Sequence, residues 1–88
     1  MTAIVEAAPR ARVTVTGRVR SIRVRPWGDH PTLEVVVFDD TAGITAVFLA
    51  RRKIAGITLG RSLTLEGVVS INRGRLTILN PAYSLLAA

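Results

Sequence analysis

Arginine is the residue that most clearly offers chemistry in this sequence. Of the 88 residues, 12 are Lys or Arg and 6 are Asp or Glu, and Lys53 is the only lysine. The guanidinium group is planar and always charged, and its N–H donors match the oxygens of a phosphate. With a formal net charge of +6, the chain is therefore expected to bind a polyanion.

Half of the basic residues lie between positions 10 and 25, where no acidic residue interrupts them. Alternate residues of an extended strand share one face, and a one-residue shift near Ser21 would bring later arginines to the same side. The residues expected on this arginine face are Arg10, Arg12, Arg18, Arg20, Arg23 and Arg25. A row of phosphate-binding side chains is the functional interpretation, and a solvated strand face is the alternative.

Trp27 lies in a segment bracketed by Pro26 and Pro31, which is predicted to be a loop. An exposed aromatic ring beside Arg25 would stack on a nucleic-acid base, a contact of about 1–3 kcal/mol that tolerates any sequence. The alternative is that this tryptophan folds inward and closes one end of the core. His30 has no second metal ligand nearby and is interpreted as a loop residue.

Two further basic segments are candidates for the same surface. Arg73 and Arg75 surround the glycine of an Asn-Arg-Gly turn, where they would hold a nucleic-acid backbone. Arg51 begins a cluster of three consecutive basic residues, for which a solvated surface is the alternative interpretation.

Catalysis has little support in the sequence. There is no cysteine, which excludes disulfides and thiolate metal sites. Asp39 and Asp40 are adjacent in a turn, so their side chains diverge, and no glycine-rich phosphate loop opens a helix. We expect a protein that is not an enzyme and uses no metal or cofactor. Its apolar runs are far shorter than the roughly 18 residues of a membrane span, so a cytoplasmic location without a membrane partner is expected.

The elements that must position these side chains are mostly strands. Alternation of apolar and polar residues predicts a long, bent strand that starts near residue 12, and four shorter ones at 32–38, 44–49, 61–70 and 75–79. Residues 39–43 and 72–74 are expected to be turns. Residues 50–57 lose the alternation and are expected to hold a short helix. Residues 1–9 are interpreted as a flexible lead-in, and residues 10–88 as a single domain.

Five strands with a helical connection between the third and the fourth are typical of the OB-fold, a Greek-key barrel. The fold class expected is therefore all-β with one short helix, a five-stranded OB-fold barrel. An SH3-like barrel is the alternative, although it does not require a helix at that point.

Five short motifs, in order, carry a resemblance to a known group. They are Asp39–Gly43, Leu49–Arg52, Ile54–Gly60, Glu66–Val69 and Asn80–Tyr83. With them the chain resembles the small actinobacterial OB-fold nucleic-acid-binding proteins from about residue 12 to residue 86. It is more distantly similar to the OB wedge domain of RecG-type helicases and to anticodon-binding OB domains. The resemblance implies nucleic-acid binding, although Ala42 stands where the family has a turn glycine.

Two functional interpretations remain at this stage. The first is a module that binds single-stranded DNA or RNA with little sequence preference, through the arginine face, the Trp27 loop, Phe38, Arg51 and the turn of Arg73 and Arg75. The second is a protein-interaction or homo-oligomerisation module. It would use an aliphatic outer face of the second and third strands, formed by Val36, Phe38, Val47 and Leu49.

Overall fold

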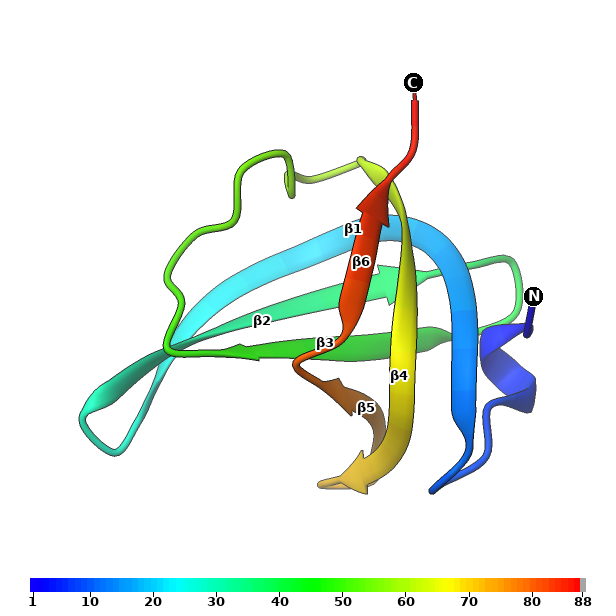
Figure 1. Ribbon diagram of the computed structural model, residues 1–88, viewed down its shortest axis with the longest axis horizontal. Helices are drawn as coiled ribbons and strands as arrows, with labels where there is room; N and C mark the ends of the chain where they lie inside the picture. Colours follow the sequence, from blue (N-terminus) through cyan, green and yellow to red (C-terminus); the bar gives the residue numbers. More distant parts are fainter. Residues whose placement is uncertain (88) are drawn as a thin grey trace.

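The computed structural model describes residues 1–87, and it describes Trp27 by its backbone alone. The chain is almost entirely β-structure, as expected (Figure 1). A short 3-10 turn, η1 (Ile4–Glu6), precedes six strands. The strands are β1 (Arg12–Trp27), β2 (His30–Phe38), β3 (Gly43–Leu49), β4 (Ser62–Asn72), β5 (Arg75–Leu79) and β6 (Ala82–Leu85).

The strands form one sheet that closes on itself. Their order is β1-β2-β3-β5-β4-β6, and β1 also pairs with β4, so that five strands make a closed circuit. The β3–β5 pair is parallel and the other pairs are antiparallel. Alternate residues of each strand point into the closed sheet, and the fully buried side chains there include Val15, Leu33, Ile44, Leu65 and Ile78. The all-β, barrel-like architecture is confirmed.

The long strand β1 belongs to two walls of the barrel. It pairs with β4 from Arg12 to Arg18 and with β2 from Arg18 to Trp27. Between Val19 and Ser21 its register shifts by one residue, which is the bulge that the change of phase predicts. In Figure 1 the blue half of β1 runs beside β4 (yellow), and after the bend its cyan half continues beside β2.

Residue 17, at this bend, has to be a glycine. A Cβ there would lie 2.5 Å from the carbonyl oxygen of Phe38 and 2.7 Å from a methyl group of Val37. The absence of a side chain therefore lets β1 approach the end of β2 closely enough to cross from one wall to the other.

The number of strands exceeds the prediction by one. Val69 pairs with Ile78 in β5, and Leu65 pairs with Tyr83 in β6, so both strands lie along the same edge of β4. Asn80 has a φ of 48° and is followed by Pro81, which breaks the pairing between them. The sixth strand thus continues the fifth after a kink. From the sequence, this segment was expected to pack against the barrel but not to form a strand.

The predicted short helix at residues 50–57 does not exist. The described residues contain no helix other than η1, and residues 50–61 form turns. Ala50 and Gly56 have φ angles of 59° and 85°, so both ends of this segment depart from helical backbone geometry. Ile54 and Ile57 are nevertheless buried, so this connection covers the core with its side chains. Within the described part of the chain, no helix is long and apolar enough to cross a membrane.

The first nine residues pack against the barrel, which differs from the predicted flexible lead-in. Ile4 has an exposed fraction of 0% and belongs to the core cluster. The N–H groups of Ile4 and Val5 donate hydrogen bonds to the side chains of Asp39 and Thr41. The alanine-rich composition suggested a loose segment, but one buried isoleucine and two long-range hydrogen bonds hold it in place.

The predicted loop around Trp27 is also shorter than expected. Pro26 pairs with Pro31 and Trp27 with His30, so only Gly28 and Asp29 lie outside the strands. Gly28 has a φ of 62° at the first position of this two-residue turn, as a type II′ hairpin turn requires. Proline is tolerated in these strands because the paired segment projects beyond the barrel.

Candidate nucleic-acid interface

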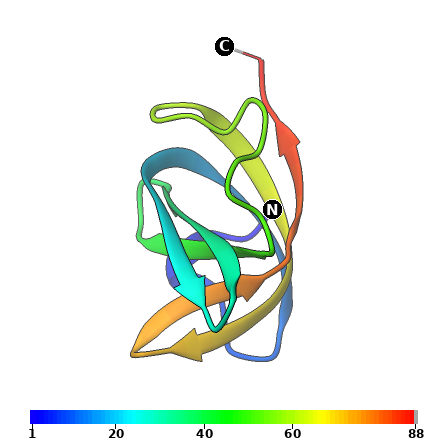
Figure 2. The ribbon, with the colours of Figure 1, turned by 90° about the vertical axis from the view of Figure 1, so that its left-hand side faces the viewer.

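A cleft of about 770 Å³ lies on the outer face of the barrel, between two hairpins. Arg25 and Pro26 of the β1–β2 hairpin line one end, and the residues from Ser70 to Arg75 in the β4–β5 hairpin line the other. Figure 2 shows the β1–β2 hairpin in front and the β4–β5 hairpin below it. The floor consists of outward-facing side chains of β2, β3 and β5, namely Thr32, Glu34, Thr45, Val47, Thr77 and Leu79.

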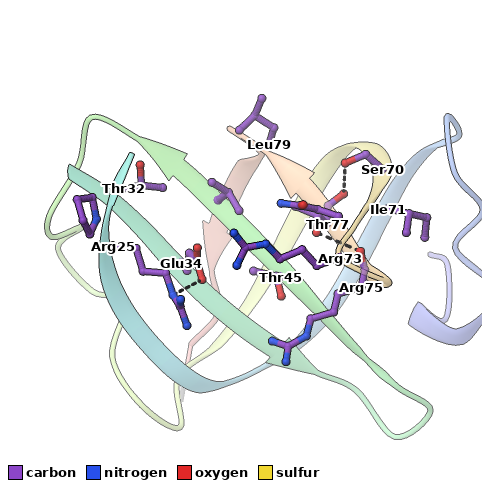
Figure 3. Close-up of a pocket in the computed structure, with 13 residues that line it drawn as sticks. Arg25, Thr32, Glu34, Thr45, Ser70, Ile71, Arg73, Arg75, Thr77 and Leu79 are labelled. Carbon is purple, nitrogen blue, oxygen red and sulfur yellow. Dashed lines mark hydrogen bonds and ion pairs between the residues drawn. The ribbon is translucent and has the colours of Figure 1, made fainter. Parts of the chain in front are cut away.

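Three arginines dominate the charge of the cleft. Arg25, Arg73 and Arg75 line it together with one acidic residue, Glu34. The Nε atom of Arg25 lies 3.2 Å from Oε1 of Glu34, which satisfies that carboxylate. Among the described residues, neither Arg73 nor Arg75 forms an ion pair. Figure 3 shows both side chains extending from the hairpin over the floor, so the cleft carries a net positive charge.

Arg73 occupies an unusual backbone conformation for an arginine. Arg73 and Gly74 are the two central residues of the β4–β5 turn, with φ angles of 55° and 76°. Two positive φ values define a type I′ turn, in which Asn and Gly are preferred at the first position. An arginine there costs about 1 kcal/mol relative to glycine. Asn72, which the sequence assigned to the turn, is instead the last residue of β4 and pairs with Arg75.

The predicted arginine face is not one continuous row, because β1 bends. Arg12 and Arg18 lie on the wall that β1 forms with β4, where Arg12 is 3.9 Å from Glu66. Arg23 pairs with Glu34 beside the cleft without lining it. Arg51 is exposed in the β3–β4 connection, away from the lining residues. Of the predicted arginines, only Arg25, Arg73 and Arg75 line the cleft.

Phe38 is not an open stacking surface. The Cζ atom of Arg20 lies 4.0 Å from the centroid of the Phe38 ring, in cation–π geometry. The Cζ end of the ring lies against Gly43, where a Cβ would approach it to 2.6 Å. Phe38 ends β2 at a distance from the cleft and does not line it. The predicted stacking by Trp27 concerns a side chain that lies outside the described part of the structure.

The aliphatic surface predicted for self-association is largely covered. Val47 has an exposed fraction of 7% on the floor of the cleft, and Val36, Phe38 and Leu49 are only half-exposed. This group therefore offers no open apolar face, which weakens the interpretation as an oligomerisation module.

Hydroxyl groups on the floor were missed by the sequence analysis. Thr32, Thr45 and Thr77 face the cleft, and the hydroxyl of Ser70 donates to the carbonyl of Thr77 at 3.4 Å. Threonine favours strands in general, so its presence did not distinguish a binding floor from an ordinary sheet face. The sequence feature that could have predicted this floor is the position of the three threonines, which all lie at outward-facing positions of strands that are neighbours in the barrel.

The pKa of Asp39 departs clearly from its ordinary value. Partial burial acts to raise this pKa, but the hydrogen bonds outweigh that effect and hold the pKa well below its usual range. The donors are the N–H groups of Ile4, Thr41 and Ala42 and the Thr41 hydroxyl. Asp39 thus organises the β2–β3 turn.

No protein-family model and no curated protein matches the chain. Among the described residues there is also no group of three or more His, Asp or Glu side chains suited to a metal ion. A functional assignment therefore depends on the shape and the charge of the cleft.

Proposed function

We propose that this chain is an OB-fold module that binds single-stranded DNA or RNA in the cleft between its two hairpins. The strand circuit supports the fold assignment, because β1 pairs with both β2 and β4 while β3 and β5 pair in parallel. The kinked extension β6 adds a strand without changing this circuit. OB-folds bind oligonucleotides on the face of their second and third strands, between the first hairpin loop and the loop that joins the last two strands.

The observation that carries the proposal is the placement of Arg73 and Arg75. Both point over the cleft floor, and neither is neutralised by a carboxylate of the described residues (Figure 3). Guanidinium groups bind phosphates bidentately, while the threonines of the floor offer hydroxyls to sugars and bases. These contacts do not read a base sequence, so little sequence preference is expected.

Binding is tested by fluorescence anisotropy of labelled dT and rU oligonucleotides over a series of salt concentrations. If three arginines contact phosphates, log K should fall with log[salt] with a slope of about −2 for single strands. Arg73→Ala and Arg75→Ala should each lower the affinity and reduce the slope by about 0.7.

Arg12→Ala is the matched control, because it removes an equal charge from the wall that β1 forms with β4. We expect it to change the affinity only slightly. The proposal is wrong if no oligonucleotide binds at low salt, or if Arg12→Ala weakens binding as much as Arg73→Ala does.

A further inference from the structure

A second, smaller hollow of about 420 Å³ adjoins the cleft. The described residues that line it are Gly28, His30, Thr32, Leu49 and Ala50. Thr32 lines both spaces, so the smaller hollow continues from the arginine end of the cleft. Unlike the cleft, it has no charged arginine or carboxylate among these residues. It suits a flat, largely apolar group better than it suits a phosphate.

The hydroxyl of Thr32 is buried and has no hydrogen-bond partner among the described residues. Thr32 has an exposed fraction of 3%, and among the described residues its Oγ1 is the buried side-chain atom without a hydrogen bond. A buried polar group in this state lowers stability, and a valine of nearly the same shape would avoid that cost. Thr32 lines both the polar cleft and the apolar hollow, and a rotation of its side chain about χ1 is what would present the buried hydroxyl to a ligand bound there.

We infer that the smaller hollow receives one unpaired nucleobase of the bound strand, with the Thr32 hydroxyl hydrogen-bonded to the edge of the base. This inference rests on the proposed function and adds a base subsite to it. A hydroxyl both donates and accepts hydrogen bonds, so it satisfies the edge of any base. The subsite therefore adds affinity without selecting a sequence.

The position of Arg25 supports this arrangement. Arg25 and Thr32 are directly paired across β1 and β2, and paired strands lie about 4.8 Å apart. A phosphate held by Arg25 would thus be close to a base held beside Thr32. Backbone and base of neighbouring nucleotides would then be recognised by two facing residues of one hairpin.

The test compares two oligonucleotides of equal length and charge, one intact and one built of abasic sites. Thr32→Val should weaken binding of the intact oligonucleotide about three- to tenfold, in line with the loss of one hydrogen bond, and leave binding of the abasic one unchanged. Thr32→Ser keeps the hydroxyl and should bind both within about twofold of the wild type. Thr32→Val should also melt at the same temperature as the wild type or higher, since it removes an unpaired buried group.

The inference is overturned if Thr32→Val leaves the affinity for the intact oligonucleotide unchanged, or lowers the affinity for both ligands equally. Because both ligands are compared on the same variant, a partial loss of folded protein affects both alike and cannot imitate the expected difference. Failure of the proposed function looks different, since the wild type would then bind neither oligonucleotide.

Discussion

Asp39 accepts a hydrogen bond from the backbone N–H of Ile4 at a distance of 2.8 Å, across 35 positions of the chain. This bond joins the N-terminal segment to the turn between β2 and β3. The other carboxylate oxygen accepts from the N–H groups of Thr41 and Ala42. One side chain therefore both shapes a turn and anchors the start of the chain.

Asp39 should make stability depend on pH in the acid range. Its pKa is lower in the folded state than in the unfolded state, where it is about 3.9, so its contribution is complete above that pH. The contribution is lost as the pH falls through the folded value. Asp39→Asn should cost about 1 kcal/mol at neutral pH and flatten the decline of the unfolding free energy below pH 4, measured by urea denaturation.

Asp40→Asn is the matched control for that experiment. Asp40 is exposed and follows Asp39 in the same turn, and its carboxylate forms no ion pair with the described residues. Its pH profile should therefore run parallel to that of the wild type. Parallel profiles for Asp39→Asn and the wild type would contradict the role assigned to Asp39.

Ile4→Ala should destabilise the protein strongly, although the residue is four positions from the start of the sequence. Ile4 is fully buried in the core cluster, and truncation of a buried isoleucine typically costs about 2–5 kcal/mol. The neighbouring Val5 is 61% exposed, so Val5→Ala should change the unfolding free energy by less than about 0.5 kcal/mol. Equal effects of the two substitutions in thermal and urea melts would show that the segment does not pack as described.

Gly43→Ala should destabilise the protein through Phe38. A Cβ at residue 43 would lie 2.6 Å from the ring, and the ring would have to leave both Gly43 and Arg20. We expect a cost of about 1–3 kcal/mol. In a Phe38→Ala background the same change should cost much less, which a double-mutant cycle measures directly. An unchanged cost in that background would mean that the backbone, and not the ring, requires the glycine.

Arg73→Asn should separate stability from binding. Asparagine adopts the left-handed conformation of this turn position more readily, so the unfolding free energy should stay constant or rise by up to about 1 kcal/mol. Oligonucleotide affinity should fall, and the salt slope should shrink by about 0.7. Gly74→Ala, which keeps the arginine but strains the turn, should instead lower stability. Full oligonucleotide affinity in Arg73→Asn would remove the functional reason for an arginine at this position.

Much of the sheet follows from the local pattern of the sequence. The alternation of Val13, Val15 and Val19 with polar residues predicted β1, and its change of phase near Ser21 predicted the bulge. Strand β6 could not be found in this way. Its residues Ala82, Tyr83 and Ser84 are all exposed, so no alternation marks them, and only the free edge of β4 makes them a strand.

The candidate site was predictable in its chemistry and not in its geometry. Arg25 and the pair of Arg73 and Arg75 were all identified as cationic candidates, and their place on one surface was expected only from the fold, because no local pattern indicates it. They are about fifty positions apart in the sequence, and they become neighbours because closure of the barrel brings the two hairpins together. The same closure buried Val47, which the pattern had placed on an open outer face.

The sequence by itself determined the first five strands, their inward faces and the excess of arginine, because these depend on residue type and on a period of two. Only the tertiary structure decided which arginines act together. The bend at Gly17 and the bulge at Arg20 direct the two halves of β1 along different walls, so an apparent single row of cations is divided. The positive charge follows from the residue types alone, whereas the surface on which these charges meet is formed by contacts between distant segments of the chain.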